Sequence, residues 1–312
     1  MFSIIIPVYN KGPHVRRSIS SVLNQTFQDF DLIVVNDASS DNSLEEMEKF
    51  DDPRIRIFQR KQRGPGGYAA RNLGIREAKG KWISFLDADD EWFSSHLTNM
   101  YELARKFPDC HFLSCGWKIV DPTGRSYNNK YYDENKARGP HRITLLQYLA
   151  YCVENKCPTH TDVGCIRNTD IALDLFPDGH ASRGGDLHAW ISYLAQCKEL
   201  AWSPTVGAVY HQNSVNMVTK SAPATVNLQK KITKDVETLV SRAEMRMLRK
   251  YSNRRIFSAW TIQKQANENT FSLASNLYWN GDWSFCLTQS LWSLLPASVT
   301  RTFVKLKQVI SG

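Results

Sequence analysis

The chain lacks a cysteine framework and any long apolar run. Its seven cysteines are an odd number, none forms a C-x-x-C pair, and no spacing matches a zinc motif. We therefore expect reduced, mostly buried thiols in a cytosolic protein. No stretch reaches the roughly 18 apolar residues of a membrane span, so no spanning helix is expected. An expected strand at residues 3–8 argues against a signal peptide.

Charge and hydrophobic content indicate the size of the core and the classes of partner that the protein could bind. The 312 residues include 42% hydrophobic ones, which is enough for a substantial core. Lys and Arg outnumber Asp and Glu by 39 to 31, a net charge of +8. This balance favours anionic partners such as nucleotides or phospholipid surfaces, and simple solubilisation is the plain alternative. The basic residues are dispersed and no recognition motif is present, so a nucleic-acid partner is not expected.

The first 90 residues alternate between short apolar runs and segments with apolar residues at helical spacing. The expected strands are residues 3–8, 30–35, 55–58 and 83–86, and the expected helices are residues 14–26, 44–50 and 68–78. Such β-α-β-α units predict an α/β fold with a parallel sheet and helices on both faces.

The pattern becomes less regular after residue 92. We expect strands at residues 110–120, 164–167 and 206–211, and helices at 94–106, at 143–154 and from about residue 186. A basic helix is expected at about residues 223–251, followed by further helices. The change from mixed α/β to all-α near residue 215 is the expected domain boundary.

Three carboxylates, Asp87, Asp89 and Asp90, directly follow the apolar run at residues 83–86. Carboxyl ends of strands are where open α/β sheets bind ligands. Paired carboxylates there suit a hard divalent cation and the phosphates that accompany it. A solvated acidic turn, or acids that cap the next helix, is the structural alternative.

Four sequence blocks in order resemble a known family. They are S-I-I-I-P-V-Y-N, V-V-N-D-A-S-S-D-N-S, G-G-Y-A-A-R-N-L-G and W-I-S-F-L-D-A-D-D, within residues 3–92. Together they resemble the nucleotide-sugar half of the family-two glycosyltransferases, which are inverting enzymes of the GT-A fold. A weaker likeness continues to about residue 213.

The resemblance implies a GT-A type α/β fold, with a mostly parallel, Rossmann-like sheet flanked by helices and a C-terminal all-helical extension. The expected domains are a glycosyltransferase domain at residues 1–214 and a helical region at residues 215–312. Within the first, residues 1–92 form the nucleotide-sugar half and residues 93–214 the acceptor half.

The resemblance also assigns a donor site. The implied donor-binding residues are Pro7, Tyr9, Asp37, Arg71, Asp87 and Asp89. Asp37 would accept hydrogen bonds from the base, and Asp89 would bind Mn²⁺ or Mg²⁺, with His211 as a further metal ligand. Each has a structural alternative: an Asx turn for Asp37, an Arg71 paired with Glu77 or Asp87, and a core or loop histidine for His211.

The acceptor half should supply a general base. The family places an acid at a helix start about 90 to 100 residues beyond its D-x-D motif, usually in an E-D pair. Asp186 stands at the matching place, and Gly185 replaces the glutamate that often orients the acceptor. A helix cap is the alternative for Asp186. Trp190 could stack on a sugar of the acceptor or belong to the core.

These features predict an inverting, metal-dependent glycosyltransferase of the hexosyltransferase class, acting in cell-surface polysaccharide or glycoconjugate assembly. A UDP-sugar is favoured as donor, and the acceptor would be a glycan or a lipid-linked glycan. A non-catalytic nucleotide-sugar or glycan-binding subunit is the alternative. The Trp and Leu residues of the C-terminal helices, beside Lys305 and Lys307, could contact a membrane peripherally or mediate homo-oligomerisation. The expected location is cytoplasmic, with peripheral contact at the inner face of the membrane.

Overall fold

The computed structural model describes residues 1–170, 174–215, 217, 226–266 and 271–295. The chain divides into two compact units, residues 1–222 and residues 223–312. This division lies a few residues beyond the boundary expected near residue 215. Each unit is described by itself.

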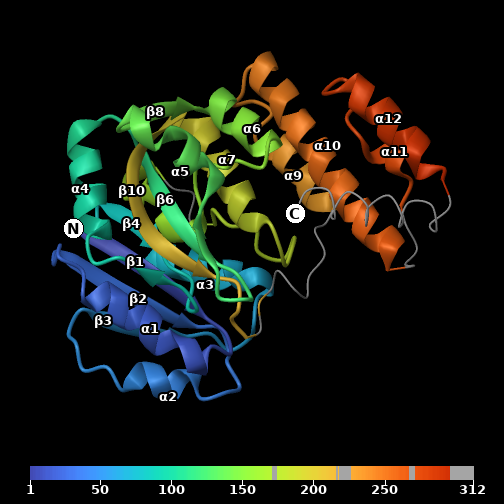
Figure 1. Ribbon diagram of the computed structural model, residues 1–312. Helices are drawn as coiled ribbons and strands as arrows, with labels where there is room; N and C mark the ends of the chain where they lie inside the picture. Colours follow the sequence, from blue (N-terminus) through green and yellow to red (C-terminus); the bar gives the residue numbers. More distant parts are fainter. Residues whose placement is uncertain (171–173, 216, 218–225, 267–270, 296–312) are drawn as a thin grey trace. The chain divides into compact units, whose positions relative to one another are not determined.

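A single mixed sheet forms the centre of the first unit (Figure 1). Its strand order is β3-β2-β1-β4-β9-β6-β10-β5, with β7 beside β6 and β8 beside β10. The strands are β1 (Phe2–Val8), β2 (Phe30–Asn36), β3 (Ile55–Gln59), β4 (Trp82–Phe85), β5 (Glu91–Trp92), β6 (Phe112–Val120), β7 (Ser126–Asn128), β8 (His141–Thr144), β9 (Cys165–Arg167) and β10 (Glu199–His211).

Strand direction separates two halves of this sheet. The pairs β1–β2, β2–β3 and β1–β4 are parallel, and β6–β10 is parallel as well. Antiparallel β9 joins the halves by pairing with both β4 and β6. The expected parallel α/β start is confirmed, because the first four strands are connected through helices, as parallel strands require.

Helices cover both faces of the sheet. They are α1 (Gly12–Leu23), α2 (Ser43–Glu48), α3 (Tyr68–Glu77), α4 (His96–Lys106), α5 (Lys130–Asn135), α6 (Leu145–Val153) and α7 (Gly185–Cys197). Single 3₁₀ turns occupy Pro65–Gly67, Lys136–Arg138, Thr161–Val163 and Asn168–Asp170.

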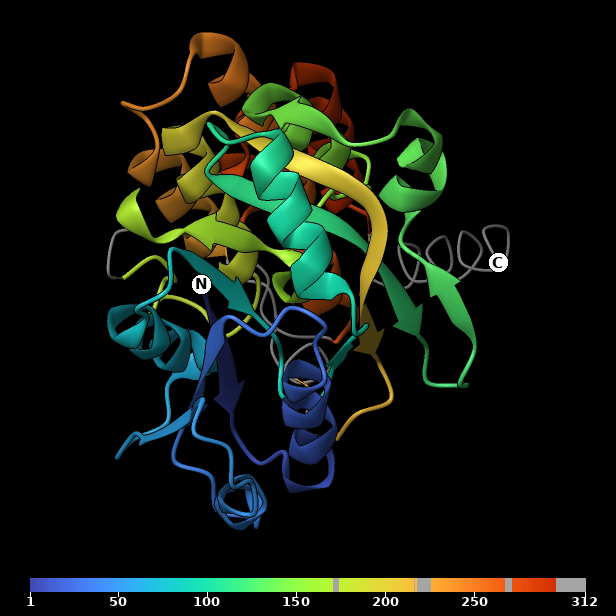
Figure 2. The same ribbon diagram turned by 90° about the vertical axis from the view of Figure 1, so that its left-hand side faces the viewer.

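Alternation along β1 assigns the helices to faces. Ile4 and Ile6 belong to a core cluster with residues of α1, α2 and α4. Ile5 points the other way and lies against Gly74 of α3, where an added Cβ would meet its side chain at 2.5 Å. Successive strand residues face opposite sides, so both faces of β1 are buried. Figure 2 shows α1 and α4 in front of the same face of the sheet.

Two expectations in the acceptor half need correction. The helix expected at residues 143–154 starts later, because Ile143 and Thr144 belong to β8, which pairs with β10. Thr144 then caps α6 through a reciprocal capping box with Gln147. The strand expected at residues 206–211 is longer, since β10 begins at Glu199 and contains an irregularity between Ser203 and Ala208.

The second unit is helical. Its described helices are α9 (Val226–Asp235), α10 (Arg242–Gln265), α11 (Leu273–Asn276) and α12 (Trp283–Ser293), coloured orange to red in Figure 1. The expected basic helix at residues 223–251 is in fact two helices, and its first residues lie outside the described ones. Ser241 and Glu244 form a capping box, which marks the start of α10 as a separate helix. Ile256 and Trp260 of α10 pack with Leu273 and Cys286.

The remaining expectations about composition can be compared with the structure. All seven cysteines are free thiols, and five of them are buried. Among the described residues, no helix is both long enough and apolar enough to cross a membrane.

Candidate active site

The carboxyl ends of β1, β2 and β4 meet at one edge of the sheet, because these strands are parallel neighbours. Pro7 lies in β1, Asp37 directly follows β2, and Asp87 lies two residues beyond β4. The backbone N–H of Asp37 donates to the Val8 carbonyl at 2.7 Å, which joins two of these ends. The topology therefore brings the donor residues expected from sequence to one edge.

Asp87 is held by a buried arginine. The Arg71 guanidinium is ion-paired with the Asp87 carboxylate and donates to the Gly66 carbonyl at 3.0 Å. Arg71 is 7% exposed, whereas the Asp87 side chain is 29% exposed, so the arginine is the buried partner of the pair. Burial raises the pKa of Asp87, and the Arg71 charge opposes this shift. The pairing with Asp87 is the structural alternative foreseen for Arg71, but its burial at this edge leaves a phosphate-binding role open.

Asp89 is paired with a residue that the sequence reading missed. The Lys11 Nζ donates to Asp89 Oδ2 at 2.7 Å and to the Val215 carbonyl at 2.6 Å. Lys11 and Asp89 are both 9% exposed. Lys11 sits in the turn after β1, where one lysine among polar residues gives no distinguishing signal. A cation bound by Asp89 would have to replace the Lys11 ammonium as its partner.

Asp87 also belongs to a cluster of three carboxylates, which includes a residue that the sequence reading missed. Asp87, Asp90 and Asp162 each bring an oxygen within 4.8 Å of the others. Asp162 is fully buried; it accepts from the Asp87 N–H at 2.9 Å and is paired with His160 Nδ1 at 2.8 Å. Although burial opposes protonation, Asp162, Asp87 and Asp186 raise the pKa of His160 to about 9.

This cluster has the chemistry of a divalent-cation site. Asp90 is 1% exposed, and its Oδ2 has no hydrogen-bond partner among the described residues. Burial, together with the neighbouring carboxylates, raises the pKa of Asp90 well above its usual range. Several hard oxygen ligands gathered at a strand end fit Mn²⁺ or Mg²⁺. These three carboxylates therefore fit the expected cofactor, although Asp89, the metal ligand expected from sequence, is not one of them.

The expected metal ligand His211 has other contacts in this structure. Its Nε2 lies 2.9 Å from Glu91 Oε1, and its backbone N–H donates to Asp90 Oδ1 at 2.6 Å. The residue thus lies beside the carboxylate cluster, but its imidazole is engaged elsewhere. Its role as a metal ligand stays a prediction.

Asp37 and Tyr9 form the region expected to bind the base. The Asp37 carboxylate is ion-paired with Arg60 and accepts from the Gly64 N–H at 3.2 Å. Asp37 is 1% exposed; burial raises its pKa and the Arg60 charge lowers it. The Arg63 guanidinium lies 4.0 Å from the centre of the Tyr9 ring. Both residues thus contact the loop before α3, which was expected only to be glycine-rich.

That loop also approaches Pro7. A Cβ added at Gly67 would lie 3.7 Å from Pro7 Cβ and 3.3 Å from an Arg71 guanidinium nitrogen. Gly67 has φ +69°, a conformation that side chains disfavour. The loop therefore brings its backbone close to the end of β1 and to the Arg71 guanidinium.

Asp186 lies in the first turn of α7, as expected from sequence. Its carboxylate has no hydrogen bond or ion pair within the described part of the chain. Its charge nevertheless contributes to the raised pKa of Tyr68 and of His160, so it lies within electrostatic reach of both. Asp186 and Asp87 are thus near one another in space, 99 residues apart in sequence.

The structure explains why residue 185 is glycine. A Cβ at Gly185 would lie 2.6 Å from the Tyr68 ring and 2.8 Å from Pro177. A glutamate cannot enter this space while Tyr68 fills it. Trp190 is 1% exposed and packs against Phe85, Phe112 and Phe176, which is the core alternative left open by the sequence.

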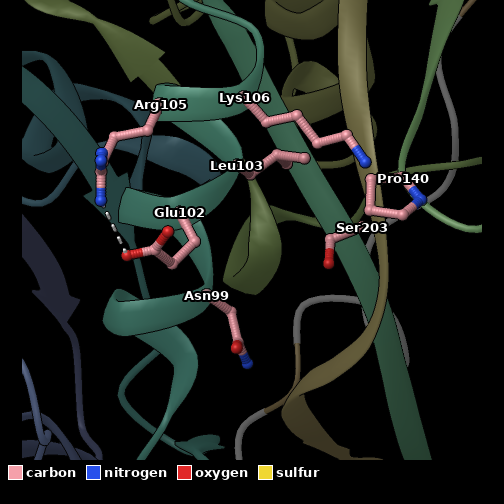
Figure 3. Close-up of a pocket in the computed structure, with 7 residues that line it drawn as sticks. All are labelled: Asn99, Glu102, Leu103, Arg105, Lys106, Pro140 and Ser203. Carbon is pink, nitrogen blue, oxygen red and sulfur yellow. Dashed lines mark ion pairs between the residues drawn. The ribbon is translucent and has the colours of Figure 1, made fainter.

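A separate surface pocket contains none of these residues. Figure 3 shows it between α4 and β10, with Glu102 and Arg105 of α4 forming an ion pair at 3.7 Å. Its lining is Asn99, Glu102, Leu103, Arg105, Lys106, Pro140 and Ser203. It lies away from the carboxyl ends of β1 and β2 and has no role in the site.

Two known proteins are similar to this chain in sequence. The Escherichia coli protein "UDP-Glc:alpha-D-GlcNAc-diphosphoundecaprenol beta-1,3-glucosyltransferase WfgD" is 30% identical over 201 residues, which are 62% of this chain and 70% of that protein. An "Uncharacterized glycosyltransferase" of Rickettsia bellii is 42% identical over 128 residues. That match covers 39% of this chain and only 18% of the Rickettsia protein.

Solved structures agree on the fold. The crystal structure of S. aureus TarS 1-349 in complex with UDP-GlcNAc superposes with a TM-score of 0.72 at 16% identity, covering 97% of this chain and 91% of that one. The GT-A type sheet with C-terminal helices is thereby confirmed. The sequence model "Glycosyl transferase family 2" matches residues 3–158. The chain belongs to glycosyl transferase family 2 and is a glycosyltransferase.

Proposed function

We propose that this glycosyltransferase is inverting and metal-dependent, with Asp186 as its general base. One observation carries the proposal. Asp186 stands unpaired among the described residues at the start of α7, within electrostatic reach of the Arg71–Asp87 pair. A carboxylate that must take up a proton works best without a fixed cationic partner.

The proposed reaction is a single displacement. The oxygen of an acceptor hydroxyl forms a bond to the anomeric carbon of the donor, and Asp186 takes up the hydroxyl proton. The bond between that carbon and the diphosphate breaks, and its electron pair leaves with the diphosphate. Attack opposite to the leaving group inverts the anomeric configuration.

The donor-side residues have binding roles in this proposal. Arg71 suits the diphosphate, because its planar guanidinium offers several donors to phosphate oxygens. Asp37 and Tyr9 would contact the base, and Pro7 would line its pocket. Asp89 and His211 would hold Mn²⁺ or Mg²⁺ beside the Asp87–Asp90–Asp162 cluster. A bound ion of this kind would offset the negative charge that develops on the leaving diphosphate.

Similar proteins narrow the substrate class. WfgD is named for UDP-glucose and for a diphosphoundecaprenol acceptor, and TarS was crystallised with UDP-GlcNAc. We extend this to a UDP-hexose donor and to a glycan or lipid-linked acceptor in cell-surface polysaccharide or glycoconjugate assembly. The proposed location is cytoplasmic, at the inner face of the membrane.

The second unit offers a surface for such a location. Trp283, Leu291 and Leu294 are 63%, 59% and 79% exposed. In the proposal this apolar face of α12 contacts the lipid surface that carries the acceptor. Lys305 and Lys307, which would add basic charge, lie outside the described residues. Co-sedimentation with anionic vesicles tests the contact, and a concentration-dependent dimer in ultracentrifugation would favour self-association instead.

The test of the proposed function separates donor binding from transfer. UDP-glucose, UDP-GlcNAc and other nucleotide sugars are screened with Mn²⁺ for a rise in melting temperature, which a bound donor should produce. The stabilising donor is then used to compare wild type, Asp186→Asn and Asp89→Asn by UDP binding and UDP release. Asp186→Asn should bind UDP normally and lose about 10²- to 10⁴-fold in turnover, whereas Asp89→Asn should lose both activities.

Four outcomes would contradict the proposal. Full turnover by Asp186→Asn would remove the assigned base, and unchanged turnover after metal chelation would remove the metal. A product with the anomeric configuration of the donor, measured by NMR, would exclude the inverting displacement. Binding of UDP without turnover of any donor would favour a nucleotide-binding subunit.

A further inference from the structure

The Tyr68 ring fills the space between two backbone segments that are far apart in sequence. A Cβ at Gly66 would lie 2.5 Å from this ring, and a Cβ at Gly185 would lie 2.6 Å from it. Only residues without a side chain permit so close an approach on both sides. Because Gly66 and Gly185 have no side chain, the Tyr68 ring fits between them.

The hydroxyl of Tyr68 contacts the start of the helix that carries Asp186. It accepts a hydrogen bond from the Gly185 N–H at 2.8 Å, in a buried environment. The first N–H groups of a helix have no partner within the helix, so an external acceptor fixes the position of the first turn. The residue that precedes α7 is Gly184, at φ +83°, and it has no side chain that could cap the helix. The phenol takes the place of such a cap.

The phenol has little freedom to move. Tyr68 is 3% exposed and stacks on Phe176, with ring centres 6.2 Å apart and planes 8° from parallel. The Asn72 side chain accepts from the Phe176 N–H at 3.0 Å and donates to the Phe176 carbonyl at 2.9 Å. The surface on which Tyr68 rests is thus fixed by the same helix, α3.

Helix α3 also reaches the donor side. Its residue Arg71, one turn beyond Tyr68, is paired with Asp87 and bonded to the Gly66 carbonyl. One rigid helix therefore bears the contact to Asp87 through Arg71 and the contact to the start of α7 through Tyr68. Displacement of either contact would be transmitted along α3 to the other.

We propose that Tyr68 is a positioning residue for Asp186: its hydroxyl anchors the first turn of α7 and its ring sets the distance between that turn and the loop at Gly66. The inference rests on the proposed role of Asp186 as the base. Tyr68 is 3% exposed, so in this proposal it acts through Asp186 and not by contact with the substrate. Its loss would misplace the base and leave the donor site in place.

The test compares two buried tyrosines. Tyr68→Phe keeps the ring and removes the hydroxyl, so it should lower kcat for UDP release from UDP-GlcNAc or UDP-glucose by roughly tenfold or more. The KM for the sugar nucleotide should stay within about twofold, because donor contacts remain. Tyr131→Phe is the matched control: Tyr131 is 1% exposed, and its hydroxyl lies 2.9 Å from His141 Nε2. This control should change neither parameter.

A measurement without substrate tests the anchor directly. Hydrogen exchange at the Gly185 amide should be slow in the wild type and in Tyr131→Phe, and faster by roughly tenfold or more in Tyr68→Phe. Gly185→Ala approaches the same contact from the other side. Its Cβ would displace the Tyr68 ring, so it should lower kcat as Tyr68→Phe does.

The outcomes keep the two proposals apart. If Asp186→Asn retains full turnover, the assigned base is wrong, whatever the tyrosine variants do. If Asp186→Asn is inactive while Tyr68→Phe matches Tyr131→Phe in kcat and in amide exchange, the base stands and the positioning role is overturned. A parallel rise in KM and fall in kcat would place Tyr68 in donor binding and would also overturn the role proposed here.

Discussion

In the region proposed to bind the donor, Asp37, Asp87 and Asp89 are ion-paired with Arg60, Arg71 and Lys11. Asp186, the proposed base on the acceptor side, has no such partner among the described residues. Asp37 and Asp89 are buried, and the Asp87 side chain is 29% exposed. Burying a carboxylate without a partner costs several kcal/mol, so pairing is what allows these acids to stay in place.

In the proposed function, this difference between the carboxylates follows from what each side of the site would have to do. Donor binding benefits from a preformed site, in which a ligand or an ion replaces one partner of an existing pair. Proton uptake instead requires a carboxylate that no cation holds in its ionised form. Substitutions can test this contrast between carboxylates that are ion-paired and a proposed base that is not.

The largest effect on stability is expected from Asp162→Ala. This change removes the fully buried carboxylate that lies 2.8 Å from His160 Nδ1, and should lower the free energy of unfolding by about 3 kcal/mol. Asp186→Ala should change it by less than about 1 kcal/mol, because Asp186 has no pair to lose. Urea unfolding of both variants measures the contrast. Equal losses would show that the two sides do not differ in this way.

Lys11→Met is expected to lower the unfolding temperature by an amount that depends on whether Mn²⁺ is present. Without metal the variant leaves Asp89 unpaired and should unfold at a lower temperature than wild type. With saturating Mn²⁺ the gap should narrow, since a cation bound at Asp89 supplies the missing charge. Lys49→Met, which removes an exposed pair with Glu46, is the control and should show no metal dependence. A gap that Mn²⁺ leaves unchanged would contradict a metal site at Asp89.

The same His160–Asp162 pair also predicts a pH dependence of the free energy of unfolding. The pKa of His160 is raised from 6.5 to about 9 in the folded chain, so its protonation stabilises the fold fully below about pH 6.5. That contribution is lost as the pH rises through about 9. The free energy of unfolding of wild type should therefore decrease over this range relative to that of His160→Gln. Parallel pH profiles would show that the His160–Asp162 pair contributes nothing.

The first half of the fold was predictable because its signals are local. The apolar runs in β1, β2 and β4 and the helical spacing in α1 and α3 fall where the structure has these elements. Beyond residue 92 the expectations were less accurate. The start of α6 was misplaced because Ile143 pairs with Leu200 across the sheet, and local hydrophobicity does not reveal such a pairing.

The site was predictable only where residues belong to ordered blocks. Asp87 and Asp89 belong to the fourth block, and Asp186 was assigned only by its spacing from that block; the roles of all three stay predictions. Lys11, His160 and Asp162 were missed because each is a single polar residue in a loop. His160 and Asp162 could have been noticed as two titratable residues in the segment T-H-T-D-V-G, directly before an apolar strand.

The sequence by itself determined the α/β alternation, the family blocks and the position of the acids at strand and helix ends, since these depend on local periodicity and spacing. Only the tertiary structure decided which residues contact those acids and the helix starts. Lys11 and Asp89, and likewise Tyr68 and Gly185, are far apart in the sequence and meet only in the folded chain, which no local pattern encodes. The glycine at residue 185 shows the limit most clearly. In the sequence it is a departure from an acidic pair, and in the folded chain it is the space that a buried tyrosine ring requires.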